Sequence, residues 1–280
     1  SCTATPPLPT PPLCQRQKNL NFKEKLHQAT RRHSSLVCVG LDTDVAKLPY
    51  GVRDKQDPIL YFNQKIIDAT ADLVCCYKPN FAFYGALGAS GFATLQRTIE
   101  HVPDHVPVLV DAKVGDIGNT ADQYAKKFFS ALDADALTVT PYMGYDAVAP
   151  FTSYKNKTTF LVCLTSNPGA DDFEKQQMGD RPLYEHVIAK AHEWNAANNI
   201  GLVIGATQPE HFARVRELAP ELPLLIPGIG AQGGDVATAV KNGQDKNGAG
   251  IIVNSSRGII FASQGDDYAE AARAAALALR

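Results

Sequence analysis

From Leu36 onward the sequence repeats one unit: a short apolar run, a polar or glycine-containing end, and a stretch with helical periodicity. Each apolar run is typical of a buried strand, and the stretch at 181–198 shows the apolar spacing of a helix. Strands that alternate with helices form parallel βαβ units, and eight of them favour a closed α/β barrel, (β/α)8 or TIM barrel, over an open sheet. The eight runs end near Asp42, Lys78, Lys113, Thr140, Thr165, Ala206, Pro227 and Asn254.

The beginning of the chain differs from the rest. Residues 1–20 are rich in proline and offer little that could pack, so we expect an extended or disordered tail. The remaining length suits one α/β barrel, and no linker divides it. We therefore expect a tail at 1–20 and a single barrel domain at 21–280, which begins with a helix at 21–32.

Composition narrows the functional classes. The net charge of -2 gives no general basic surface, so we expect no nucleic-acid partner. No apolar run is long enough for a membrane span. The six cysteines include no CxxC pair and the histidines no HExxH pair, so we expect no metal site. This cysteine pattern favours a reducing, cytoplasmic compartment.

The stretch 108–120 joins an apolar run to three charged residues, Asp111, Lys113 and Asp116. If 107–113 is a strand, Asp111 and Lys113 point to the same face. Burying two carboxylates and an ammonium at a strand end is costly unless they compensate one another. A salt bridge at the sheet rim is one interpretation, and a catalytic array is the other.

The first two apolar runs add Asp42 and Lys78. Either residue alone is more often a cap or a rim charge. In a barrel, however, functional groups gather at the carboxyl ends of the strands, so these charges would share one mouth with those of 108–120. Mutual pairing would then keep them ionised.

Residues 227–235 contain the pattern GxGxxG, which is typical of dinucleotide binding. The next apolar run ends at Asn254, without the acidic residue that holds a ribose in that motif. A barrel commonly binds phosphate in the loops after strands seven and eight, where Gln232 could donate and the planar fork of Arg257 suits a phosphate. A purely structural glycine turn is the alternative.

The fifth run closes at 165–169, and few apolar residues follow in 170–180. At a barrel mouth such a polar segment can serve as a lid over the site. A plain surface loop is equally compatible with the composition, so both interpretations stay open.

Together these motifs resemble the orotidine 5'-phosphate decarboxylase family. Residues 111–120 are similar to its DxKxxDIxNT signature, and the other matching segments occur in the family's order at 78–80, 165–169, 227–235 and 254–259. The TSNPG sequence at 165–169 resembles the bacterial-type subgroup. The resemblance implies cofactor-free decarboxylation of orotidine 5'-monophosphate to uridine 5'-monophosphate, the last step of de novo pyrimidine synthesis.

The resemblance also implies catalytic roles. Lys113 would protonate C6 of the pyrimidine, and Asp111 would lie beside the departing carboxylate. Lys78 would order this network and the ribose. Asp116 would complete the charged array from the neighbouring subunit, which implies a homodimer.

Further residues would bind substrate. Ile117 and Thr120 would reach across the dimer interface together with Asp116. The others would contact ribose, pyrimidine or phosphate, namely Asp42, Asn80, Ser166, Gln232, Arg257 and Gly258.

One position departs from the signature. Arginine is frequent at the position of Val114, so an interface salt bridge from that residue is in doubt. Strand alternation turns Val114 away from Lys113, so we expect the charged array to survive and the dimer to persist through apolar contacts.

Three other functions compete with this one. A 3-keto-sugar-phosphate decarboxylase or aldolase of the same superfamily would use the first carboxylates to bind magnesium. A barrel could also bind nucleotides without catalysis, as a sensor or scaffold. Lastly, it could hold an unrelated phosphate ligand.

Overall fold

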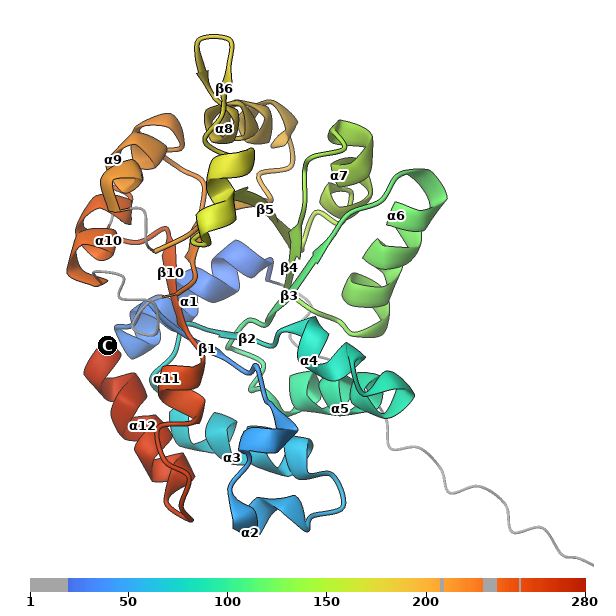
Figure 1. Ribbon diagram of the computed structural model, residues 1–280, viewed down its shortest axis with the longest axis vertical. Helices are drawn as coiled ribbons and strands as arrows, with labels where there is room; N and C mark the ends of the chain where they lie inside the picture. Colours follow the sequence, from blue (N-terminus) through green and yellow to red (C-terminus); the bar gives the residue numbers. More distant parts are fainter. Residues whose placement is uncertain (1–19, 207–208, 229–235, 247) are drawn as a thin grey trace, which may run out of the picture.

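A closed barrel of parallel strands forms the centre of the molecule (Figure 1). The computed structural model describes residues 20–206, 209–228, 236–246 and 248–280. Its main sheet has eight strands in the order β2-β1-β10-β9-β8-β5-β4-β3. The strands are β1 Val37–Gly40, β2 Cys76–Lys78, β3 Leu109–Val114, β4 Ala136–Val139, β5 Thr158–Leu164, β8 Ile200–Ile204, β9 Leu224–Ile226 and β10 Ile251–Ser255.

The two end strands of this order, β2 and β3, meet and close the barrel. Parallel bridges join Tyr77 to Val108 and Asn80 to Asp111. The Asp111 N–H also donates to the carbonyl of Pro79 at 2.9 Å. Each of the eight predicted runs contains one strand, so the predicted (β/α)8 architecture is confirmed.

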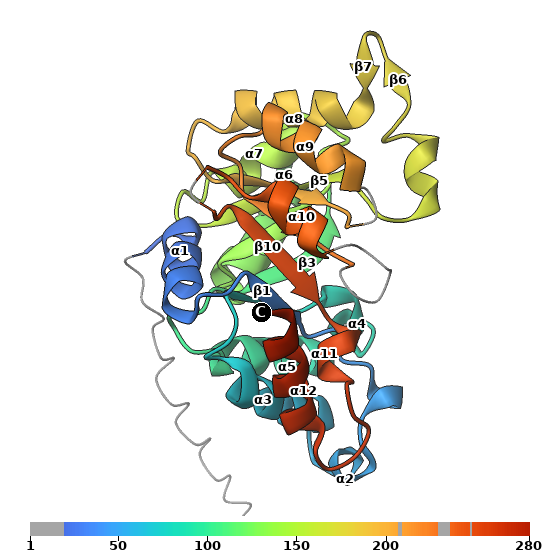
Figure 2. The same cartoon turned by 90° about the vertical axis from the view of Figure 1, so that its left-hand side faces the viewer.

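Helices surround the barrel (Figures 1 and 2). The predicted helix at 181–198 is shorter in the structure, at Leu183–Trp194. The helices are α1 Phe22–His33, α2 Tyr50–Arg53, α3 Pro58–Thr70, α4 Phe81–Gly85, α5 Gly88–His101, α6 Gly118–Ala125, α7 Tyr145–Thr152, α8 Leu183–Trp194, α9 Pro209–Leu218, α10 Val236–Gly243, α11 Arg257–Ile260 and α12 Tyr268–Leu279. Short segments add the 3-10 helices Val45–Lys47 and Pro168–Asp172 and a π-helical continuation of α6 at Lys126–Ala131.

Helix α1 covers the amino-terminal end of the barrel (Figure 2). It begins with a capping box, in which the Asn21 side chain accepts from the Glu24 N–H and the Glu24 carboxylate accepts from the Asn21 N–H. Phe22 packs edge-on against Phe160, with ring centroids 5.6 Å apart. This end of the barrel is therefore filled, and the opposite end holds the mouth.

The segment 168–181 has more structure than a plain polar loop. After the 3-10 helix, the antiparallel pair β6 Gln177–Met178 and β7 Arg181–Pro182 forms a hairpin that projects from the barrel (Figure 2). The two interpretations of this segment, a lid and a surface loop, both stay predictions.

Two further findings concern the cysteines and the search for a membrane span. Among the described residues, the cysteines Cys38, Cys75, Cys76 and Cys163 are buried free thiols. No helix in the described part of the chain combines the length and apolarity of a membrane span. The predicted tail at 1–20 lies outside the described residues except for its last position.

Candidate active site

Four of the predicted charged residues meet at the mouth of the barrel. The Lys113 ammonium lies 2.6 Å from Oδ1 of Asp111, and the Lys78 ammonium lies 3.2 Å from Oδ2. Oδ1 of Asp42 is 3.9 Å from the same Lys78 nitrogen. The carboxyl ends of β1, β2 and β3 therefore bring an alternating array of charges together, as the sequence predicted.

Burial and charge oppose each other within this array. Asp111 is 7% exposed and Lys78 is 2% exposed. Burial alone favours the neutral acid at Asp111, but the ammonium groups of Lys78 and Lys113 hold the pKa of this carboxyl well below its usual value. Burial likewise favours the neutral amine at Lys78, yet the carboxylates of Asp111 and Asp42 raise its pKa above the usual value. The buried pair is therefore ionised at neutral pH.

The backbone around Lys113 differs from the regular strand that we expected. Lys113 has a φ of 46°, in the left-handed region, and the register with β4 shifts between Val110 and Val114. Simple strand alternation therefore fails at Lys113, although its amine still reaches Asp111. Val114 packs against the hydrophobic core, while the side chain of Lys113 is 48% exposed in the mouth.

Asp116 stands apart from the array in this chain. Its Oδ1 accepts the N–H of Ile117 at 2.8 Å, and no ion pair joins it to a lysine within the described residues. Ile117 and Thr120 are exposed beside it. A side chain at Gly115 would clash with Thr140, so this turn passes against the end of β4. Within the signature at 111–120, Asp111 is therefore buried, whereas residues 117–120 are exposed.

The predicted pyrimidine and ribose residues lie at the ends of neighbouring strands. Asn80 follows β2, and its Oδ1 caps α4 by accepting the Ala82 N–H at 3.1 Å. Ser166 follows β5 and is half-buried. A Cβ at Gly205 would lie only 2.6 Å from the Ser166 nitrogen, so glycine allows the segment after β8 to approach Ser166 closely.

Arg257 starts α11 at the end of β10 and is exposed, as is the adjacent Gly258. It faces a cavity of about 320 Å³ that it shares with Asp42, so the predicted ribose and phosphate residues border the same space. Gln232, the other predicted phosphate donor, lies outside the described residues. The cavity is lined by Asp42, Asp44, Lys47, Phe83, Arg257 and Phe261.

Sequence reasoning missed two residues of this region. Thr138 in β4 donates to Oδ1 of Asp111 at 2.8 Å, and Lys47 adds a second cation beside Arg257. A β-branched threonine suits any strand, so Thr138 carried no signal of its own. Lys47 lies in a short 3-10 helix after the first run, where a polar residue also needs no special explanation.

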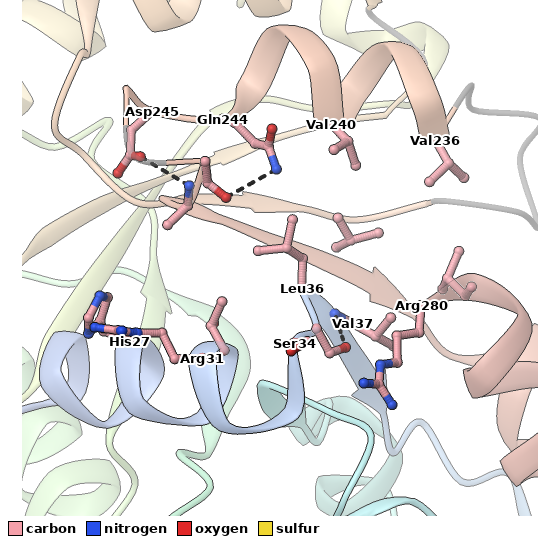
Figure 3. Close-up of a pocket in the computed structure, with 16 residues that line it drawn as sticks. His27, Arg31, Ser34, Leu36, Val37, Val236, Val240, Gln244, Asp245 and Arg280 are labelled. Atoms are coloured by element: carbon pink, nitrogen blue, oxygen red, sulfur yellow. Dashed lines mark hydrogen bonds between the residues drawn. The ribbon is translucent and has the colours of Figure 1, made fainter.

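A larger cavity, of about 770 Å³, lies near the amino-terminal end of β1 (Figure 3). Residues of α1 and α10 line it, among them His27, Arg31 and Val240. It includes none of the predicted site residues. Size alone would favour this cavity, whereas the ionised array lies at the mouth.

Comparisons with known proteins agree with the geometry of the mouth. Residues 35–275 match the family described as "Orotidine 5'-phosphate decarboxylase / HUMPS family". The orotidine 5'-phosphate decarboxylase of Verminephrobacter eiseniae is 50% identical over 269 residues, which cover 93% of this chain and 97% of that protein. The enzyme of the same name from Azoarcus sp. is 49% identical over 265 residues, with the same two coverages.

A solved structure extends the match to three dimensions. The OMP decarboxylase of Leishmania donovani superposes with a TM-score of 0.81 at 38% identity, covering 93% of this chain and 97% of that one. The match of sequence and of fold spans nearly the whole chain, including all of the mouth. The chain therefore belongs to the orotidine 5'-phosphate decarboxylase / HUMPS family.

Proposed function

We propose that the charged array at the mouth of the barrel decarboxylates orotidine 5'-monophosphate. The family match and two relatives at about 50% identity support this activity. The chain is thus a carboxy-lyase that catalyses the last step of UMP biosynthesis. The observation that supports giving the chemistry to particular residues is the Lys78–Asp111–Lys113 array.

The reaction makes two demands of the site. Loss of carbon dioxide leaves a carbanion at C6 with little delocalisation, so negative charge must be stabilised and a proton delivered. The ammonium of Lys113 can do both. Its side chain is half exposed to the mouth, while its nitrogen is held 2.6 Å from Asp111. In this proposal Lys113 gives its proton to C6 as the carbon dioxide leaves.

Asp111 and Lys78 prepare the site for this step. The buried Lys78 ammonium keeps Asp111 ionised, and Asp111 in turn holds the Lys113 ammonium in place. These charges are set before substrate arrives, so little reorganisation is required during the reaction.

Binding away from the reacting carbon supports the chemistry. Arg257 with Gly258 and Gln232 would hold the phosphate, and Lys47 adds positive charge to the same cavity. Asp42 and Asn80 would bind the ribose, and Ser166 would meet the pyrimidine. Binding energy from phosphate and ribose can then be used to position the ring over Lys113.

A homodimer is the finer part of the proposal. Asp116 has no lysine partner within the described part of its own chain, so we place its partner in the second subunit's site. Exposed apolar side chains adjoin it, with Ile117 after β3 and Tyr142 and Met143 after the neighbouring β4. In this proposal these exposed apolar side chains form part of the interface between the subunits.

Two further refinements concern the subgroup and the location of the enzyme. The TSNPG sequence at 165–169 supports the bacterial-type subgroup. A cytoplasmic location is supported by the buried free thiols among the described residues.

The test is the loss of absorbance by orotidine 5'-monophosphate, measured with and without EDTA. We expect turnover in both conditions, because the array supplies charge and proton without a metal. Lys113→Ala should lower kcat at least about 100-fold, the size of a general-acid contribution. Lys65→Ala, which removes an exposed lysine of α3, is the matched control and should be active.

Other outcomes identify the competing functions. Activity abolished by EDTA would favour the magnesium-dependent sugar-phosphate enzymes. Tight nucleotide binding without turnover would favour a sensor or scaffold.

A further inference from the structure

A single buried hydroxyl joins the catalytic carboxylate to the irregular part of β3. Thr138 lies in β4 and is 0% exposed. Its Oγ1 donates to Oδ1 of Asp111 at 2.8 Å and accepts the N–H groups of Ala112 at 3.0 Å and Lys113 at 2.9 Å. One hydroxyl thus contacts three consecutive residues of the catalytic strand.

These contacts occur where the ladder between β3 and β4 is interrupted. The register shifts between Val110 and Val114, and Lys113 takes the left-handed conformation that a residue with a side chain adopts at an energetic cost. The N–H groups of Ala112 and Lys113 bond to the Thr138 hydroxyl, which thereby replaces a ladder acceptor. Without it, two backbone donors in this region would lose their partner.

The direction of the hydroxyl proton is also determined. Because Oγ1 accepts from two N–H groups, its own proton points to Asp111. Oδ1 therefore accepts two hydrogen bonds, one from this hydroxyl and one from the Lys113 ammonium, while Oδ2 faces Lys78. The hydroxyl therefore fixes the rotation of the carboxylate that aims the two lysines.

We propose that Thr138 is a positioning residue for the decarboxylation. It acts through Asp111 and the Lys113 backbone to hold the proton-donating amine where C6 of the substrate lies. This inference rests on the proposed roles of Asp111 and Lys113. Thr138 lies outside the residues that line the Arg257 cavity, so its contribution belongs to the chemical step rather than to phosphate binding.

The experiment compares Thr138→Val, which keeps the shape and removes the hydroxyl, with Thr138→Ser, which keeps the hydroxyl. We expect Thr138→Val to lower kcat by about tenfold or more, since a misplaced catalytic group can cost about 100-fold. KM and the Kd for UMP should change by less than about threefold, because groups remote from Thr138 supply most of that binding. Thr138→Ser should restore most of kcat.

The control is Thr159→Val in the adjacent strand β5. Thr159 is also fully buried, and its hydroxyl lacks a hydrogen-bond partner among the described residues. The same chemical change there should leave kcat unaltered and should not lower stability. A general effect of altering a buried threonine would appear in both variants.

A second measurement does not require turnover. Acetylation of Lys113 by acetic anhydride, followed by peptide mass, reports how firmly Asp111 holds the amine. We expect faster acetylation in Thr138→Val than in wild type, Thr138→Ser or Thr159→Val. If wild type proved inactive while this difference remained, the proposed function would fail. The inference that Thr138 holds the Lys113 amine through Asp111 would still stand.

The proposal is overturned if Thr138→Val retains wild-type kcat and wild-type Lys113 acetylation. It is equally overturned if Thr138→Ser loses as much activity as Thr138→Val, since the hydroxyl would then not be the cause. A fall in UMP affinity that matches the fall in kcat would also contradict it, because that pattern indicates a general loss of structure.

Discussion

Single residues at the mouth keep their charges because they are buried together. Asp111 would tend toward the neutral acid if it were alone, and Lys78 toward the neutral amine. With the two ammonium groups at 3.2 and 2.6 Å, the pKa of Asp111 instead lies well below its usual value. Removing one partner would leave an uncompensated buried charge, which is strongly destabilising.

This depressed pKa predicts how stability depends on pH. The folded-state pKa of Asp111 lies below the ordinary value of 3.8, so its ionised form stabilises the fold above that pH and the contribution is lost as the pH falls. We expect the stability difference between wild type and Asp111→Asn to be constant from pH 7 to about pH 5 and to begin to shrink as the unfolded carboxyl titrates. Below pH 4 it should shrink by up to about 1 kcal/mol per pH unit.

Urea unfolding of both proteins at several pH values checks this. A difference that stays constant down to pH 3 would show that the carboxylate gains nothing from its ionised partners. Because both proteins contain the same other acids, the comparison isolates Asp111.

At the scale of elements, buried hydrogen bonds hold the loop that carries Asp42. Thr43 donates to Oδ1 of Asn63 at 2.6 Å, and the Asn63 amide donates to the Tyr84 hydroxyl at 2.9 Å. Tyr84 then donates to the carbonyl of Leu41 at 2.9 Å. Helices α3 and α4 thus fix the residues on both sides of Asp42. A fully satisfied buried network of this kind rigidifies its surroundings.

The projecting segment 168–181 is either a lid or a plain surface loop, and these two interpretations predict different rates of proteolysis. If it closes over bound nucleotide, trypsin cleavage after Lys175 should slow when UMP is present. Lys155 lies in an exposed turn at the other end of the barrel, and cleavage there is the internal control. Equal rates after Lys175 with and without UMP, as read by peptide mass, would favour the plain surface loop.

At the scale of the whole molecule, barrel closure brings residues from distant parts of the chain to one mouth. Asp42 and Arg257 border one cavity although 215 positions separate them. At the opposite end, Lys25 of α1 forms a buried ion pair with Asp135 at 2.6 Å. The amino-terminal end of the barrel therefore holds stabilising contacts, and the carboxyl-terminal end holds the candidate site.

The proposed homodimer is a property of the whole molecule. We expect sedimentation at micromolar concentration to give about twice the chain mass of 30.2 kDa, despite Val114. Tyr142→Asp, at a side chain that is 80% exposed beside the mouth, should shift the protein toward monomer and reduce activity. The reduction follows because Asp116 would no longer reach the second site.

Leu277→Asp is the matched control, since Leu277 is exposed on α12 and should leave the dimer intact. Lys113→Ala and Asp116→Ala should each have little activity alone, and mixing them should restore part of it, because one site of a mixed dimer keeps both residues. A fully active monomer would contradict the shared site.

Local patterns in the sequence predicted the barrel and the grouping of charges at its mouth. Apolar runs and helical spacing are local patterns, so they predicted all eight barrel strands and the stripe of α1. The charged residues at strand ends then followed from the barrel, since parallel strands place their carboxyl ends together. The family signature added roles for each of them.

The way in which these residues are held became visible only in the folded barrel. The left-handed backbone at Lys113 and its bonds to Thr138 depend on the register of two strands, which no local pattern records. The separation of Asp116 from the lysines follows a turn that packs at Gly115 against Thr140. Such contacts join residues far apart in sequence, so their geometry arises only when the sheet has closed.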